Sequence, residues 1–95
     1  MLQISGDKVR RDGAIVGYIE GMYIKGHDYK PLGYFKDDQH IYDVTGKPVA
    51  YIDGEYLYAY TSRSSRTELD KINKAIKGDV LSEIARCAVY QLIGA

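Results

Sequence analysis

The chain has 95 residues, and its 13 basic and 13 acidic side chains give a formal net charge of zero. A chain of this length forms one domain that buries only about 60–65% of its unfolded surface, which favours further stabilisation by oligomerisation. The balanced charge excludes the strongly basic surface that is typical of nucleic-acid-binding domains.

The single cysteine, Cys87, excludes an intrachain disulfide and indicates a reducing, cytoplasmic compartment. Residues 1–7 lack the basic and apolar regions of a signal peptide. No apolar run reaches the roughly 18–20 residues that a membrane-spanning helix needs. We therefore expect no membrane span, and no residue pattern calls for a cofactor or a metal.

Short strands and tight turns are predicted along the first 60 residues. Leu2–Ile4 forms a first strand, and three similar units follow over residues 8–19, 22–35 and 40–52. Each unit has a turn in its middle and a phrase at its end that reads apolar, small, tyrosine, apolar. The phrases are Val16-Gly17-Tyr18-Ile19, Leu32-Gly33-Tyr34-Phe35 and Val49-Ala50-Tyr51-Ile52, with tyrosines 16 and 17 residues apart. We interpret each unit as a β-hairpin.

The turn chemistry differs between the units. Asp12-Gly13 favours a tight hairpin turn, because glycine accepts a positive φ angle. In the second unit Tyr29 stands where this glycine is expected, which favours a bulge or a wider turn. Residues 55–60 open a fourth, truncated unit, in which tyrosines alternate with Leu57 and Ala59 and form one aromatic face.

A lone hairpin is marginal in water, so the units must pack together. The sequence therefore predicts a mainly β fold, with repeated hairpins forming a barrel- or flower-like body over residues 1–60. Residues 61–66 are rich in serine and arginine and are predicted to be a polar linker. Residues 67–95 are predicted to be a C-terminal helical segment of the same structural domain.

One or two helices are predicted in this segment. Leu69, Ile72, Ala75 and Ile76 share a helix face, and Gly78 ends that helix. The following segment, Val80–Ile93, is apolar nearly all round and must be buried on several sides. A neighbouring subunit is the favoured cover for it, and burial within the monomer is the alternative.

Candidate site residues are few. Arg63 and Arg66 lie among serines before a predicted helix and are a possible anion site. His27 and His40 are candidates for a histidine site at a subunit interface, but no metal-ligand spacing accompanies them. A subunit interface is predicted at Tyr56, Tyr58, Tyr60, Leu81, Ile84, Ala88 and Leu92.

The repeated Asp-x-x-Gly-x-x-Val-Ala-Tyr-Ile phrase resembles that of small bacterial proteins described as four-fold β-flower domains. The resemblance rests on residues 16–19, 32–35 and 43–52 and extends over residues 1–60. It implies a flower-like fold and carries no catalytic residues. The phrase is also similar to the strand-turn-strand of PRC-barrel domains, which serve as adaptors in RNA-processing and photosynthetic complexes. Three closely spaced copies followed by helices fit that family less well.

The favoured hypothesis for function is a non-enzymatic structural or protein-interaction module that acts as a homo-oligomer. The first alternative is a protein that binds a small ligand or an anion through tyrosine-lined surfaces and Arg63 or Arg66. The second is an enzyme with a histidine site between subunits, and binding of nucleic acid is not expected.

Overall fold

The computed structural model describes residues 2–78 and 82–94, with the backbone alone described at residues 62–64. The fold is mainly β, as predicted: one open, mixed sheet of hairpins is followed by two C-terminal helices. The strands are β1 (Leu2–Ser5), β2 (Lys8–Arg11), β3 (Ala14–Glu20), β4 (Tyr23–Gly26), β5 (Pro31–Lys36), β6 (His40–Asp43), β7 (Pro48–Asp53), β8 (Tyr56–Ala59), β9 (Ser62–Glu68) and β10 (Ile76–Gly78). The helices are α1 (Leu69–Ala75) and α2 (Glu83–Leu92).

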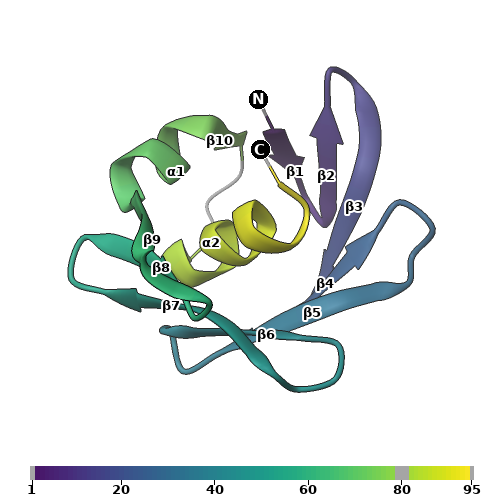
Figure 1. Cartoon of the computed structure of the whole chain (residues 1–95). Coiled ribbons are helices and arrows are strands. Elements are labelled where there is room, and N and C mark those ends of the chain that lie inside the picture. Colours follow the sequence, from purple (N-terminus) through teal and green to yellow (C-terminus); the bar gives the residue numbers. More distant parts are fainter. Residues whose placement is uncertain (1, 79–81, 95) are drawn as a thin grey trace.

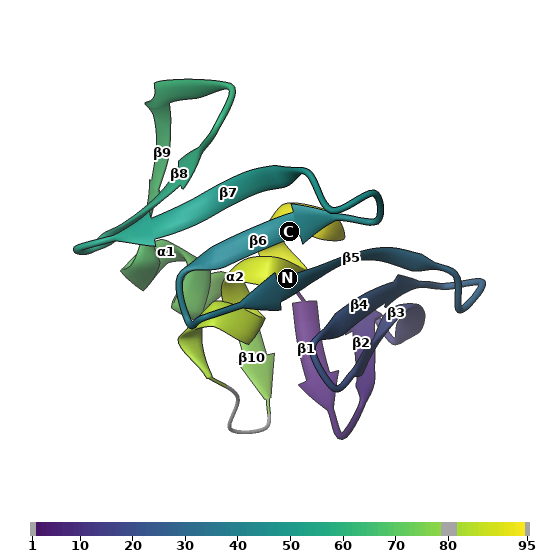
Figure 2. The ribbon, with the colours of Figure 1, turned by 90° about the horizontal axis from the view of Figure 1, so that it is seen from below.

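Neighbouring strands pair antiparallel from β1 to β9, and β10 pairs parallel with β1. The sheet curls around α2 without closing into a barrel, and α1 lies in the opening between its edge strands β9 and β10 (Figure 1). Seen from below, β4 to β7 form a twisted ribbon that covers one side of α2 (Figure 2). The flower-like arrangement is therefore observed, and the barrel alternative is not.

A repeated backbone hydrogen bond defines four equivalent hairpin units. An amide near the end of each unit donates to a carbonyl before its first strand: Ile19 to Asp7 at 2.8 Å, Phe35 to Met22 at 3.0 Å, Ile52 to Gln39 at 2.8 Å and Leu69 to Glu55 at 2.9 Å. Each hairpin also has a register shift, at which its second strand, β3, β5, β7 or β9, has extra residues relative to the first. Because such bulges bend a strand, their repetition explains the curl of the sheet.

The fourth unit is complete. This corrects the prediction that it is truncated and the prediction that a linker follows it. Residues 61–66 are not a linker, since Ser62–Glu68 is β9 and pairs with β8. Its composition concealed this strand, because Thr67 and Glu68 stand where the other units have a glycine or alanine and a tyrosine. Backbone pairing with β8 at Ser62 and at residues 66–68 forms this strand, and such pairing does not require apolar side chains.

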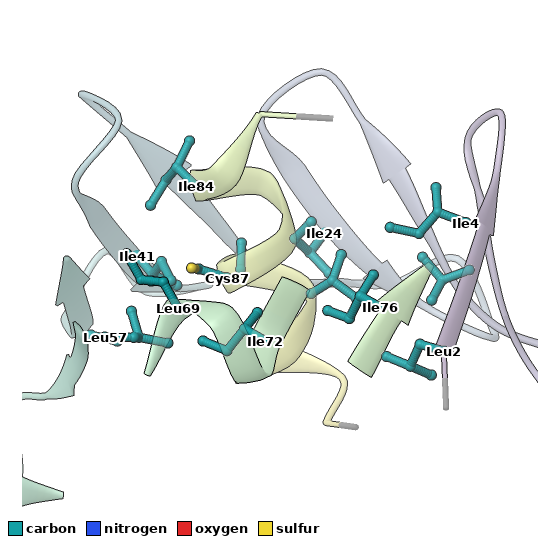
Figure 3. Packing of buried hydrophobic residues seen from close by; sticks show 14 residues of the cluster. Leu2, Ile4, Ile24, Ile41, Leu57, Leu69, Ile72, Ile76, Ile84 and Cys87 are labelled. Atoms are coloured by element: carbon teal, nitrogen blue, oxygen red, sulfur yellow. The ribbon is translucent and has the colours of Figure 1, made fainter. Parts of the chain in front are cut away.

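The hydrophobic core lies between the inner face of the sheet and the two helices. Ile24, Ile41 and Leu57 from three successive units meet Ile84 and Cys87 of α2 (Figure 3). Leu69 and Ile72 of α1, with Ile76 of β10, complete the cluster from the open side of the sheet. The radius of gyration is 12.1 Å, close to the value of about 12 Å expected for a compact domain of this length.

The apolar helix α2 is covered within the chain. Ile84, Ala85, Cys87, Ala88 and Val89 are all at most 3% exposed. This corrects the expectation that a neighbouring subunit covers the segment: the curled sheet surrounds it on several sides, as an apolar helix requires.

The helix ends differ from the sequence-based expectation. The first helix stops at Ala75, and Ile76 begins β10 instead of continuing the helix face. The second begins with Ser82 as its N-cap, whose hydroxyl accepts a 3.3 Å hydrogen bond from the Ala85 amide. Neither helix of the described ranges is long and apolar enough to cross a membrane.

Candidate functional site

The outer surface of the sheet is dominated by tyrosine. Tyr18, Tyr34 and Tyr51 each follow a buried small residue and precede an apolar residue that packs against the core. Because side chains alternate between the faces of a strand, these rings point outward. The three tyrosines therefore occupy equivalent places, as the repeated phrase predicts. With Tyr23, Tyr42, Tyr56 and Tyr58, they form what we name the outer tyrosine face.

Cross-strand register brings these rings into contact. Tyr34 is paired with Tyr42, and their rings stack with centroids 5.0 Å apart and an interplanar angle of 18°. Tyr51 is paired with Tyr58 in the same way, at 5.3 Å and 15°. Such ring pairs stabilise by about 0.5–1.5 kcal/mol beyond their buried area. The rings therefore form an ordered aromatic surface on the outside of the sheet.

A different cluster forms around Tyr29 of the second unit, where it meets the first unit. The Tyr29 ring meets Tyr18 edge-on at 5.1 Å, and Lys25 Nζ lies 3.9 Å from the centre of the same ring. Lys25 also forms a 3.3 Å ion pair with Glu20. Tyr29 has a φ angle of +67°, so it adopts the left-handed conformation for which glycine is the usual residue. Its contacts with Tyr18 and Lys25 help to offset this strain.

The predicted anion site is only partly described. The guanidinium carbon of Arg66 lies 4.8 Å from the centre of the Tyr56 ring, which is a cation–π contact. Arg66 and Lys71 line a hollow of about 350 Å³ together with Glu68. The Glu68 carboxylate offsets part of their positive charge, which weakens attraction for an anion. The side chain of Arg63 lies outside the described part of the structure.

The predicted interface residues fall into three groups. Tyr56 and Tyr58 are half-buried on the outer tyrosine face, and Tyr60 is 47% exposed beside them, with its ring 4.8 Å from that of Tyr51. Ile84 and Ala88 are buried within the chain, and Leu92 lies against Gly33. Leu81 lies outside the described residues. Among the described residues of this set, the three tyrosines and Leu92 therefore keep some accessible surface.

The structure does not bring the two histidines together. His27 is exposed in the turn after β4, whereas His40 begins β6 with its Nδ1 atom buried. Across residues 2–78 and 82–94, no histidine bonds to a carboxylate, and no group of histidine, cysteine and acidic residues is arranged to hold a metal ion. The geometry gives no support to the histidine-site alternative.

Within the described part of the chain, the ionisable groups with shifted pKa values are Cys87 and Asp43. Burial raises the pKa of the Cys87 thiol to about 12, and the Glu83 carboxylate adds to the effect. A hydrogen bond from the Thr45 hydroxyl and another from the Lys47 amide hold the pKa of the Asp43 carboxyl below its usual value. Cys87 is therefore an unreactive buried thiol, and Asp43 is a fixed, ionised carboxylate.

Several surface hollows were not predicted from the sequence, and two of them bear on function. One, of about 300 Å³, lies on the outer tyrosine face among Met22, Tyr23, Tyr34 and Lys36. The other, of about 470 Å³, lies between the β6–β7 turn, the β8–β9 turn and α2. Met22, an apolar residue in the turn after Gly21, is the sequence feature that could have indicated the first hollow. The second joins segments far apart in sequence, so no local pattern marks it.

Comparison with known proteins gives one match. Neither the curated proteins nor the solved structures contain a match to the chain. Residues 25–65 match the family model described as 4-fold beta flower protein. This match runs from β4 into β9 and so covers the second and third hairpins and most of the fourth. The resemblance to four-fold β-flower domains that the tyrosine phrase predicts is thereby confirmed for residues 25–65 of this chain.

Proposed function

We propose that the protein is a non-enzymatic interaction module that binds a second copy of itself through the outer tyrosine face. The observation that carries this proposal is the exposure of Met22 and Tyr23, at 53% and 51%, beside the hollow of about 300 Å³. Tyrosine and methionine are enriched in protein interfaces, where their apolar parts are buried and the tyrosine hydroxyls find partners. The exposed side chains and the hollow are adjacent on one face.

This adjacency favours a two-fold contact. In a two-fold dimer the same patch serves both copies, so Met22 of each copy can enter the hollow of the other. The formal net charge of zero means that no long-range repulsion opposes the approach of two copies. Tyr56 and Tyr58 then extend the contact along the outer tyrosine face, and both belong to the interface that is predicted from the sequence.

The subunit number does not follow from the family description. Four hairpin units within one chain already account for the word "4-fold". The proposal is therefore a dimer, and it depends on the exposed patch alone. We also infer a cytoplasmic location, because the chain holds a single, reduced and buried cysteine, Cys87.

Sedimentation velocity over a wide range of concentrations tests the dimer. The wild-type protein is expected to shift from monomer to dimer, and Tyr23→Asp is expected to remain monomeric because it buries a charge in the contact. Tyr29→Asp is the matched control, since Tyr29 is 49% exposed in a turn at the other end of β4. A wild-type monomer at every concentration, or equal loss of association in both variants, contradicts the proposal.

A further inference from the structure

The larger hollow, which we name the third-unit cleft, lies where the repeat of the four units is broken. Three successive residues at the end of α2 face three successive units. A Cβ atom added at Gly17 would lie 2.5 Å from Ile93 Cδ1, and one at Gly33 would lie 2.9 Å from Leu92 Cδ1. Apolar side chains of α2 therefore rest directly on the small residue of the first two units.

The third unit departs from this pattern. Its small residue is Ala50, which is paired with Ala59, and the α2 residue that lines the adjoining cleft is the polar Gln91. The cleft has a volume of about 470 Å³, within the range of roughly 300–1,000 Å³ that is usual for small-molecule sites. At the third unit, where α2 presents the polar Gln91 in place of an apolar side chain, the groove thus has the volume of a ligand site.

One side of the cleft is apolar and includes an aromatic ring. Pro48, Val49, Ala59 and Tyr60 form this side. The Tyr60 ring is held in place by Tyr51, at a centroid distance of 4.8 Å, and is still 47% exposed. A ring that is both fixed and accessible can pack against a flat apolar surface of a ligand with little loss of side-chain entropy.

The remaining side offers both donors and acceptors of hydrogen bonds. Asp43, Lys47, Thr61 and Gln91 contribute a carboxylate, an ammonium, a hydroxyl and an amide. Asp43 is fixed by its own turn, since its Oδ1 atom accepts from the Thr45 amide at 2.9 Å, the Thr45 hydroxyl at 2.6 Å and the Lys47 amide at 3.0 Å. One negative and one positive side chain leave the cleft without net formal charge.

We propose that the third-unit cleft binds a short, neutral saccharide. A sugar ring has an apolar face of C–H groups, which suits Tyr60 and Pro48, and a rim of hydroxyls that donate and accept, which suits Asp43 and Gln91. A multiply charged anion would meet a single ammonium, that of Lys47, already opposed by Asp43. A wholly apolar ligand would leave Gln91 and Thr61 without partners.

Saturation-transfer NMR and calorimetry with the intact protein test this proposal. The probes are cellobiose, maltose and the disaccharide of N-acetylglucosamine, with benzoate and inorganic phosphate as non-saccharide probes. At least one saccharide is expected to bind, with signals strongest for the ring protons on its apolar face. Tyr60→Ala and Gln91→Ala are each expected to weaken that binding about tenfold, as loss of an aromatic contact or a hydrogen bond in a small site does.

The controls separate the cleft from the rest of the surface. Tyr29→Ala removes a ring of similar exposure, 49% against 47%, and is expected to leave binding unchanged. The Tyr23→Asp variant is expected to bind the saccharide normally, so failure of the dimer and failure of the cleft are distinguishable. Circular dichroism checks that each variant is folded, and Gln91→Ala stands alone if Tyr60→Ala does not fold. Absence of binding by every saccharide, binding of benzoate or phosphate alone, or equal loss in Tyr29→Ala overturns the proposal.

Discussion

The Leu69 amide donates a hydrogen bond of 2.9 Å to the Glu55 carbonyl oxygen, and this bond completes the fourth hairpin unit. Leu69 is also the first residue of α1 and is 7% exposed in the core. One residue therefore ends the repeated sheet and begins the helical segment. The body and the helices are joined at this point without a spacer.

This junction predicts that the hairpin body does not fold alone. A chain that ends at Ser65 loses most of β9 pairing, both helices and the cover of Ile24, Ile41 and Leu57. Exposure of these side chains removes the main stabilising term of a small domain. The truncated chain is expected to give the far-ultraviolet circular dichroism and the narrow amide NMR dispersion of an unfolded protein. A dispersed, cooperative β spectrum from residues 1–65 would contradict this.

The close approach at Gly33 predicts a strongly destabilising substitution. An added Cβ would overlap the Tyr42 carbonyl oxygen and lie 2.9 Å from Leu92 Cδ1, so Gly33→Ala forces backbone and helix apart. We expect a loss of about 2–3 kcal/mol in the free energy of unfolding, measured by urea denaturation.

Gly54→Ala is the matched control for that measurement. Nothing lies within 4 Å of an added Cβ there, and only the φ angle of +64° disfavours alanine. Its expected cost is about 1 kcal/mol. Equal costs at the two positions would mean that the contact with α2 is not what requires glycine at residue 33.

Burial of Cys87 predicts a protected thiol. The thiol is fully buried, and its pKa is raised to about 12, so native protein is expected to react with an aromatic disulfide reagent only through opening of the structure. Adding denaturant should raise the rate of this reaction to that of a free cysteine. Because the folded state keeps its proton where the unfolded thiol loses it, stability should fall as the pH rises above about 8.5. Cys87→Ala should reduce that fall, and fast labelling of native protein would contradict the burial.

The turn around Asp43 predicts an acid-sensitive contribution to stability. The pKa of Asp43 is lower in the folded protein, so its contribution is present above the unfolded pKa of about 3.9 and is lost as the pH falls through the lower folded value. Carbon-13 NMR titration should show the Asp43 carboxyl titrating below the value of about 3.9 that an unperturbed aspartate has. The difference in stability between wild type and Asp43→Asn should shrink in the same acidic range. A stability difference that is constant with pH would count against the role of the carboxylate charge.

The repeated phrase predicted the fold because it records a physical requirement of every unit. A small residue lets α2 approach at Gly17 and Gly33, a tyrosine covers the outer face, and the apolar residue after the tyrosine packs against the core. The second strand of the fourth unit, β9, escaped prediction because it does not carry this pattern. There Thr67 replaces the small residue and Glu68 replaces the tyrosine, so backbone pairing alone reveals the equivalence.

The candidate sites were less accessible to sequence reasoning. The tyrosines were recognised as surface residues because their alternation with Leu57 and Ala59 is local. The third-unit cleft unites Asp43, Tyr60 and Gln91, which no sequence period relates. Burial of α2 within its own chain was not the favoured prediction. The space inside the curled sheet depends on the register shifts of all four hairpins together, and no single segment of the sequence reveals it.

The parallel pairing of β10 with β1 has a consequence for the order of events during synthesis. Leu2 is made well before Ile76 and must wait for it before the outer edge of β1 is covered. On the ribosome the nascent hairpins can form one after another while that edge stays open to wrong partners. Long-range pairing of this kind is slow compared with hairpin closure. The last step of folding is thus the arrival of the C-terminal third, which closes the edge and fills the hollow side of the sheet at once.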